Sequence, residues 1–360
     1  MISPFMKKNI NSSLAIALHA LRKEILQFDF NYPLERDPLA GPRDSLHYYL
    51  YSDRLKWEAM RMDAQGIPKT WDRTSGTNYW PGYVAWYALV ELGHYLRHRG
   101  SQHLDNFLKQ VDWLERHASL RDDGAIVWLM DFDYHEGRLL LRGPWVSAHT
   151  QGLVISAIVR GWRLTKRSNL WELLQRSAKI FELDETRGGI RTEVDGSTFY
   201  TEKPGYPLPG ILDGFLTSLL GLYDLYVETQ DAKVAELFEI GIESLKDLLA
   251  YWDYRKRWSW YGHHEYVSPP AYHCLNRMLL SVLGGLTAES SLTERAERWD
   301  PANLSAIEKA SIYLSFVLTK NAARLRHRTW ASRSILDDSG DKPEPLFHTT
   351  DPRPPRRGVG

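Results

Sequence analysis

Two kinds of helical segment alternate along the chain from about residue 79. The first kind is apolar on most of its surface, which predicts buried helices: GYVAWYALVELGHYL from Gly82, GLVISAIVRGWRL from Gly152, GFLTSLLGLYDLY from Gly214 and YHCLNRMLLSVLGGL from Tyr272. Each is followed by an amphipathic segment: LDNFLKQVDWLERH, LWELLQRSAKIFEL, KVAELFEIGIESLKDLLAYW and LSAIEKASIYLSFVLTKNAARL. The first three apolar segments begin 70 and 62 residues apart. Paired helices at this period predict an α/α toroid, an incomplete α/α barrel with an inner and an outer ring. An irregular helical bundle is the alternative.

The flanking segments differ from this repeat. Alternating aromatics in LHYYLY and the turn residues of DAQGIP predict a small β-hairpin region. The tail is rich in proline and arginine and has little to bury, so we expect it to be disordered. The predicted organisation is an N-terminal extension with one helix at 1–40, a small β region at 41–75, the mainly α toroid at 76–335 and the disordered tail at 336–360.

Charge and cysteine content exclude several classes of protein. Lys+Arg and Asp+Glu are both 45, so no global charge draws the chain to nucleic acid or to an anionic membrane. The single cysteine, Cys274, excludes an internal disulfide and fits a reducing compartment. The apolar stretch Leu14 to Leu21 is interrupted by His19 and predicts an amphipathic helix rather than a signal peptide. No run approaches the roughly 20 apolar residues of a membrane span. We expect a cytoplasmic protein; a homodimer stays open.

The candidate chemistry lies in the loops that precede the apolar helices. Inner helices of a toroid run in the same direction, so the loops 72–81, 131–147, 196–210 and 258–271 should meet at one rim. The N–H groups of the helix N-termini there favour anions such as carboxylates. The chain has 14 Trp, 19 Tyr and 11 Phe, and aromatic rings stack on the C–H faces of sugars. Most of these rings are nevertheless expected in the core.

Familiar cofactor and metal motifs are missing from the sequence. It has no P-loop, no GxGxxG after a strand, no HExxH and no GxSxG. His263, His264 and Glu265 are adjacent, but adjacent side chains rarely converge on one ion. We predict neither a cofactor nor a metal. The basic run from Arg255 to Arg257 is interpreted as a solvated loop.

Four segments of the chain resemble the D-glucuronyl C5-epimerase family. They are YYLYSDRLKW and DAQGIP within 48–68, GPWVSAHTQGLVISAIVRGWRLT at 143–165, FYTEKPGYPLPGILDGFLTSLLGLYDL at 199–225 and WSWYGHHEYVSPPAYHCLNRMLLSVL at 258–283. The resemblance implies an α/α barrel behind a β region. It also implies an enzyme that turns glucuronate into iduronate within an acidic polysaccharide, as in heparan-type chains.

The reaction that the resemblance implies sets a physical demand on the site. The C5 proton is α to a carboxylate, so its removal makes a dianionic enolate that the site must neutralise. The family pattern places proton transfer on Glu202, Tyr261 and Tyr272. A free tyrosine has a pKa of about 10, so a nearby cation such as Lys203 is expected to lower it. Residues expected to bind substrate are His264, Trp80, Trp145, Tyr206, Asp213 and His273.

The sequence departs from the family pattern at positions that matter. The pattern has Glu-Tyr-Pro where this chain has Glu202 followed by Lys203, so a family tyrosine becomes a lysine that we include among the catalytic candidates. A family arginine is His264, and a family asparagine is Asp213. His149 is interpreted as a wall residue. A polysaccharide lyase that shares the C5 proton abstraction, and a non-catalytic glycan-binding protein, therefore remain alternatives to an epimerase.

Overall fold

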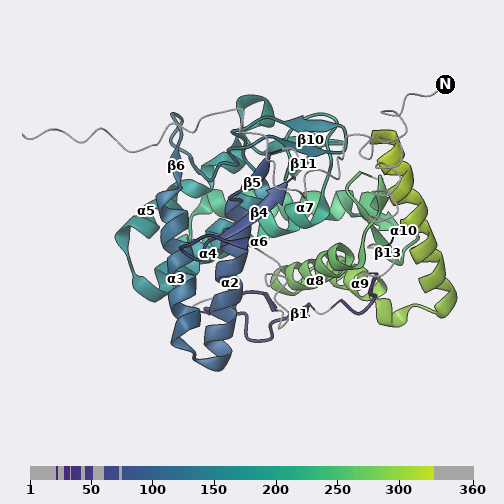
Figure 1. The fold of residues 1–360 in the computed structure, drawn as a ribbon, viewed down its shortest axis with the longest axis horizontal. Helices are drawn as coiled ribbons and strands as arrows, with labels where there is room; N and C mark the ends of the chain where they lie inside the picture. The colour runs from purple at the N-terminus through teal and green to yellow at the C-terminus, as the bar shows by residue number, and fades with distance from the viewer. Residues whose placement is uncertain are drawn as a thin grey trace, which may run out of the picture.

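The computed structural model describes residues 22, 28–32, 34–41, 45–51, 61–72, 75–263 and 265–327. It is mainly helical with small antiparallel sheets (Figure 1), as the fold class predicts. The helix predicted around 14–21, the tail at 336–360 and His264 lie outside the described residues.

Four helices of equal length form the centre of the fold. They are α2 (Pro81–His98), α4 (Ala148–Thr165), α6 (Leu212–Thr229) and α8 (Pro270–Thr287), each of 18 residues. Each packs against the next, α4 and α6 most extensively. Each also ends at a residue in the left-handed conformation, which turns the chain back sharply. These C-cap residues are Arg99, Lys166, Gln230 and Ala288.

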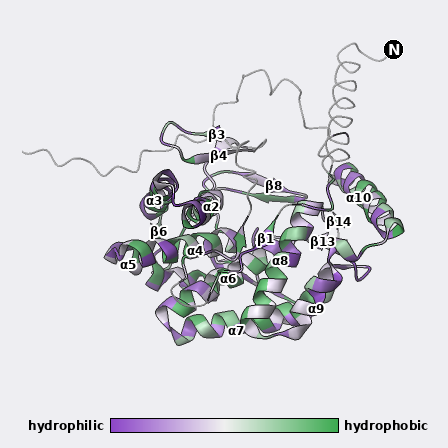
Figure 2. Ribbon diagram, turned by 90° about the horizontal axis from the view of Figure 1, so that it is seen from below, coloured by the Kyte–Doolittle hydropathy of each residue, from purple (hydrophilic) through white to green (hydrophobic). Residues whose placement is uncertain are grey.

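A second helix follows each of these after a short turn. The second helices are α3 (Ser101–Arg116), α5 (Ser168–Ser177), α7 (Ala232–Leu248) and α9 (Ser290–Arg298). They bury one stripe only, such as Leu170 and Leu174 of α5. Figure 2 shows hydrophilic residues along α3, α5 and α9. The repeat of one buried and one amphipathic helix is therefore present. Closure of the row into a toroid stays a prediction.

Two of the central helices, α4 and α6, approach each other closely at a pair of glycines. A Cβ on Gly221 of α6 would lie 2.4 Å from the Cα of Gly152 of α4. A Cβ on Gly152 would in turn lie 2.5 Å from the carbonyl oxygen of Thr217. Only glycine permits this contact between backbones. It explains why both apolar segments carry a glycine at this level.

Short antiparallel strands fill the connections. The strands are β1 (Glu35–Arg36), β2 (Leu50–Tyr51), β3 (Arg61–Met62), β4 (Pro68–Asp72), β5 (Gly76–Asn78), β6 (Ser119–Leu120), β7 (Ile126–Val127), β8 (Tyr134–Glu136), β9 (Leu139–Leu141), β10 (Arg191–Val194), β11 (Ser197–Tyr200), β12 (Asp253–Tyr254), β13 (Trp258–Tyr261) and β14 (Tyr266–Val267). They pair as β1–β2, β3–β4–β5, β6–β7, β8–β9, β10–β11 and β12–β13–β14. The remaining elements are the 3-10 helices Lys179–Glu182, Glu185–Arg187, Leu249–Trp252 and Pro301–Asn303 and the last helix α10 (Ala306–His327), at the edge of the molecule in Figure 1.

The position of the strands determines where a site can form. Each hairpin from β6 to β14 lies between an outer helix and the next inner helix, so the strands lead into inner-helix N-termini. The backbone N–H of Ala148, at the start of α4, donates to the carbonyl of Thr201 just after β11, at 3.0 Å. Neighbouring loops are thereby fastened together at the rim where the sequence placed the candidate chemistry.

A buried ion pair fastens the N-terminal aromatic segment to the helices. Arg160 of α4 pairs with Asp224 of α6 at 2.7 Å, and both side chains are almost fully buried. The Tyr49 hydroxyl donates to the same carboxylate at 2.7 Å, and Arg160 also donates to the carbonyl of His47 at 3.1 Å. The YYLY segment is therefore part of the core.

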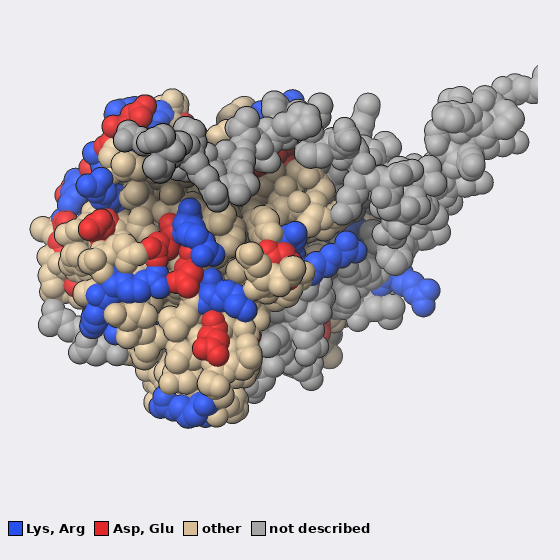
Figure 3. Space-filling model, turned by 60° about the vertical axis from the view of Figure 1, so that its left-hand side comes forward, with Lys and Arg blue, Asp and Glu red and all other residues tan. Residues whose placement is uncertain are grey.

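The surface carries both signs of charge. On the face that Figure 3 shows, Lys and Arg side chains are interspersed with Asp and Glu. Across the described ranges, no helix is both long and apolar enough to span a bilayer. An acidic ligand must therefore be recognised by a local arrangement of cations.

Candidate functional site

Lys203 lies at the centre of the candidate site, just after β11. It is only 4% exposed. Its ammonium pairs with Glu136 of β8 at 2.5 Å and with Glu202 at 3.4 Å, and lies 5.0 Å from the ring centre of Tyr134. Burial alone would lower the pKa of Lys203, but Glu136, and to a lesser degree Tyr134 and Glu202, raise it well above its ordinary value. Lys203 is therefore a fixed cation rather than a base.

Glu202, next to Lys203, has one carboxylate oxygen without a hydrogen-bond partner among the described residues. Its Oε1 faces Lys203, while its buried Oε2 accepts no hydrogen bond from any described residue. A Cβ on Gly214, in the first turn of α6, would lie 2.5 Å from Oε2. The glycine thus makes room for the carboxylate. An unpartnered buried carboxylate oxygen is costly, which is typical of a functional group awaiting a ligand.

Asp213, also in the first turn of α6, is a third carboxyl in this region. It is 5% exposed. Burial, and then the charge of Glu202, raise its pKa to about 8. The charges of Glu202, Glu136 and Lys203 all act on Asp213, so retaining a proton on Asp213 reduces the excess negative charge. At neutral pH Asp213 is therefore a neutral hydrogen-bond donor.

Two of the predicted tyrosines meet beside this charged group. The ring centres of Tyr261 (β13) and Tyr272 (α8) are 5.1 Å apart, edge to face. Tyr266 stacks on Tyr261 at 4.9 Å, and the ammonium of Lys320 (α10) lies 3.4 Å from the centre of the Tyr266 ring. Burial is the main cause that raises the pKa of Tyr261, Tyr266 and Tyr272 well above the ordinary value. Lys203 was expected to lower the pKa of these tyrosines, but its influence is weaker than that of burial. All three side chains are therefore neutral phenols.

The first turns of α2 and α4 contribute two further side chains. His149 of α4 is partly exposed; burial lowers its pKa, while the charge of Glu202 opposes the shift. Tyr83 of α2 is 36% exposed, yet burial raises its pKa, as expected for a side chain that lines a recess. A neutral imidazole and a phenol thus border Glu202 and Lys203.

His273, which we expected to bind substrate, lies in the interior of the protein. It is fully buried and stacks on Trp258 at 3.5 Å. Its Nδ1 accepts from the backbone N–H of Ser259 at 3.1 Å, so Nε2 carries the proton and donates to the carbonyl of Trp299 at 2.8 Å. Burial lowers its pKa to about 3. Both nitrogens are occupied, and His273 links β13 to α8 and to the end of α9.

The two predicted tryptophan platforms are also buried. Trp80 (8% exposed) donates to Thr150 Oγ1 at 3.1 Å, and Trp145 (6%) donates to the carbonyl of Phe132 at 2.9 Å. They pack edge to face at 5.7 Å and support Tyr134 rather than offer a flat face to a sugar. Tyr206, also expected to bind substrate, is by contrast 93% exposed in its loop.

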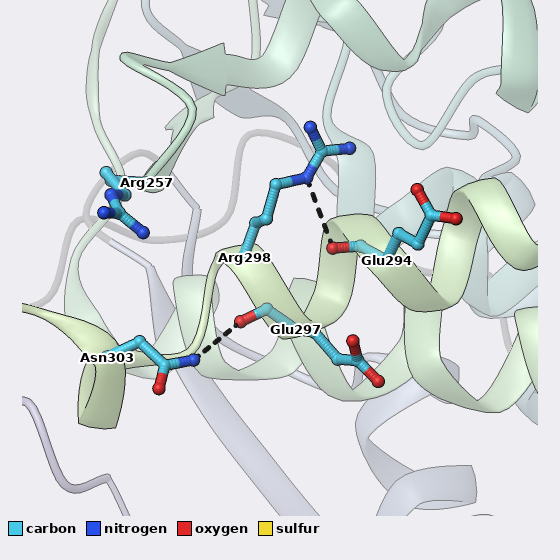
Figure 4. A pocket seen from close by; sticks show the side chains of 5 residues that line it. All are labelled: Arg257, Glu294, Glu297, Arg298 and Asn303. Carbon is cyan, nitrogen blue, oxygen red and sulfur yellow. Dashed lines mark hydrogen bonds between the residues drawn. The ribbon is translucent and has the colours of Figure 1, made fainter.

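A surface pocket lies apart from these residues. It has a volume of about 380 Å³ and is lined by Arg257, Glu294, Glu297, Arg298 and Asn303 (Figure 4). Arginines and glutamates alternate around it, and Arg257 is paired with Glu308 at 3.0 Å. It holds none of the tyrosines, so we do not assign the chemistry to it. Within the described part of the chain, no three His, Cys, Asp or Glu side chains are grouped so that they could hold a metal ion.

Comparison with known proteins identifies the family. Residues 121–301, about half of the chain, match the family described as D-glucuronyl C5-epimerase C-terminus. The chain belongs to this family. Among D-glucuronyl C5-epimerases, the chain is 30% identical over 219 residues to the protein of that name from Caenorhabditis elegans. The alignment covers 56% of this chain and 35% of the nematode protein, so the chain spans about a third of that relative's length.

Sequence reasoning missed several members of the site. Glu136 was overlooked because its partner Lys203 is 67 residues away, and only the β8–β9 hairpin brings it close. Lys320 lies in an amphipathic helix that the repeat assigned to the outer layer. His149 could have been proposed as a site residue from its position in the first turn of an inner helix, because the candidate loops precede these turns.

Proposed function

We propose that this chain is a uronate C5-epimerase that converts D-glucuronate to L-iduronate within an acidic polysaccharide. One observation carries the proposal: the family match contains five side chains of the candidate site, namely Glu202, Lys203, Asp213, Tyr261 and Tyr272. Because the chain spans only part of its nematode relative, the polymer itself belongs to the proposal and is not inherited from that protein's name.

Epimerisation needs a proton acceptor and a proton donor on opposite faces of C5. In the proposed reaction a base takes the C5 proton, and the electron pair of the C–H bond delocalises into the carboxylate as an enolate. A second group then returns a proton to the other face. We assign the roles of proton acceptor and proton donor to Tyr261 and Tyr272, whose neighbouring rings belong to different elements. Glu202 is the carboxylate that assists these proton transfers. Raised pKa values make their phenolates strong bases, although the phenolate form is rare.

Lys203 and Asp213 stabilise the intermediate in this proposal. The enolate carries one more negative charge than the substrate, so a preformed cation and a neutral donor lower the barrier most where that charge develops. Lys203 supplies the cation. Asp213, protonated below about pH 8, supplies a donor without adding a negative charge.

A polysaccharide lyase is the second candidate, favoured by the lysine that replaces a family tyrosine. It would share the C5 proton abstraction but then break the C4–O bond, releasing the 4-linked sugar and leaving a C4=C5 double bond. A glycan-binding protein without catalysis is the third candidate.

Incubation with an unsulfated glucuronate polymer in D2O separates the three candidates. Deuterium at C5 together with new iduronate signals in the NMR spectrum supports the epimerase. New ultraviolet absorbance from an unsaturated uronate identifies a lyase. Measurable binding without exchange or absorbance would refute both enzymes and leave the binding protein.

A further inference from the structure

The β3–β4–β5 sheet presents a face that combines an exposed aromatic ring with cations. Arg61 is paired with Lys69, and Trp71 with Thr77, in the antiparallel register. Directly paired residues, and residues two apart on a strand, share a face of a sheet. Arg61, Lys69 and Trp71 therefore lie on one face. Trp71 is 54% exposed and is the only exposed tryptophan among the described residues.

Among the described residues, the cations of this sheet form no close ion pair. No described carboxylate lies within 4.0 Å of the charged nitrogens of Arg61, Lys69 or Lys109. Lys109 belongs to α3, and its ammonium lies 3.4 Å from where a Cβ on Gly66, in the β3–β4 turn, would be. The nearby Asp63 is occupied by local hydrogen bonds from the N–H groups of residues 65 and 67 and from a tyrosine hydroxyl.

The sheet leads directly into the wall of the candidate site. Lys69 lies 5.0 Å from the ring centre of Tyr79, the residue that follows β5. The ring of the next residue, Trp80, lies 5.3 Å from the ring of Tyr134. The Tyr134 ring in turn lies 5.0 Å from the ammonium of Lys203. Figure 2 shows β3 and β4 on the same side of the helices as β8, which carries Glu136. A polymer of several sugars whose reacting uronate lies beside Lys203 would pass close to this sheet.

We propose that the face carrying Arg61, Lys69 and Trp71 is a second binding site for the acidic polysaccharide, which holds the chain beyond the reacting uronate. The indole would stack on the C–H face of one sugar, and the cations would pair with its carboxylate or sulfate groups. This inference rests on the proposed function for the identity of the polymer.

Charge and shape favour this occupant over a protein partner or a lipid surface. Apart from Trp71, the residues on this face of the strands are Arg61, Lys69 and Thr77, so there is no continuous apolar patch of the kind that a protein or membrane contact needs. An isolated ring between cations instead matches a ligand with alternating C–H faces and anions.

The test compares long and short substrates of the full chain. The probes are the unsulfated polymer of alternating glucuronate and N-acetylglucosamine and a tetrasaccharide cut from it. For Trp71→Ala and Lys69→Gln we expect kcat/KM for C5 exchange on the polymer to fall about three- to tenfold. We expect the value for the tetrasaccharide and the thermal midpoint to stay unchanged. Leu120→Ala, another exposed apolar residue (60%), is the matched control and should change neither value.

A separate binding measurement keeps this inference distinct from the proposed reaction. Polymer affinity, followed by titration without turnover, should weaken in Trp71→Ala even if the wild-type chain shows no exchange. Its salt dependence should be reduced in Lys69→Gln. Equal losses on polymer and tetrasaccharide, unchanged polymer affinity in both variants, or equally tight binding of neutral dextran would overturn the proposal.

Discussion

Replacing Lys203 by methionine is the sharpest test of the charged group in the site. Lys203 is 4% exposed and serves both Glu136 and Glu202, whose side chains are only 17% and 10% exposed. Methionine keeps the length of the side chain but leaves two nearly buried carboxylates without their cation. Removing one partner of a buried ion pair costs about 3–5 kcal/mol. Because Glu136 retains some solvent, we expect a loss of about 3 kcal/mol at pH 7.

That loss follows from the carboxylates left behind. Without Lys203 the two negative charges lose the cation that stabilises them and repel each other. The free energy of unfolding, measured by urea titration at pH 7, should therefore be lower in Lys203→Met than in wild type. Adding Glu136→Gln should recover part of the loss, with a coupling of about 1–2 kcal/mol. Lys246→Met, which breaks more exposed ion pairs, is the control and should cost much less.

Kinetics of the same position distinguish a cation from a base. Arginine keeps the charge and cannot accept a proton near neutral pH. Lys203→Arg should therefore retain measurable C5 exchange, whereas Lys203→Met should lower kcat and also raise KM, because the cation is lost to both the enolate and the substrate carboxylate. A loss below about 1 kcal/mol in Lys203→Met at pH 7 would refute the buried-pair reasoning. If Lys203→Arg were as inactive as Lys203→Met with unchanged substrate affinity, Lys203 would be the base.

Three further predictions concern its neighbours. Tyr261→Phe and Tyr272→Phe should each lower net epimerisation by roughly 10²–10⁴ with little change in binding; near wild-type turnover in both, measured by NMR, would contradict the two-tyrosine assignment. The pKa of Asp213, about 8, is above that of an unfolded aspartate, so the contribution of Asp213 to the free energy of unfolding should fall as pH rises from about 4 to about 8, whereas His273 contributes in the opposite sense at the acidic end. Asp213→Asn removes this contribution, so the wild-type value minus the variant value, measured by urea titration, should decrease across this range, and a constant difference would contradict the assigned pKa shift. Gly214→Ala places a methyl group 2.5 Å from Glu202 Oε2, so we expect at least a tenfold loss of turnover, measured beside the thermal midpoint; unchanged turnover would show that the carboxylate can move.

The helical part of the fold was predictable because its signal is periodic and local. Buried helices need apolar residues all around, and their outer partners need a single stripe, so the sequence distinguishes α4 from α5 directly. Family resemblance then located Tyr261 and Glu202 in segments that precede inner helices and Tyr272 at the start of one. The structure brings the two tyrosines to 5.1 Å, although they belong to a strand and to a helix.

The direction in which a side chain points was harder to predict. Trp80, Trp145 and His273 occupy rim segments, and residue type suggested contact with sugars. Each instead directs its polar N–H to a protein acceptor in the interior. A buried indole or imidazole needs such a partner, and the partner belongs to another part of the chain. Sequence spacing carries no information about that pairing.

The two departures from the family pattern are linked electrostatically. With Glu136, Glu202 and Asp213 all ionised, the group around Lys203 would carry an excess of two negative charges and would repel a uronate. This excess already includes the positive charge of Lys203. The raised pKa of Asp213 lowers it to one negative charge, because the carboxyl remains protonated at neutral pH. A protonated carboxyl has one donor and one acceptor, the same hydrogen-bonding pattern that the family asparagine amide can present along one edge. In the proposed function, Lys203 and the proton on Asp213 therefore act in the same direction, since both reduce the negative charge that a uronate would meet.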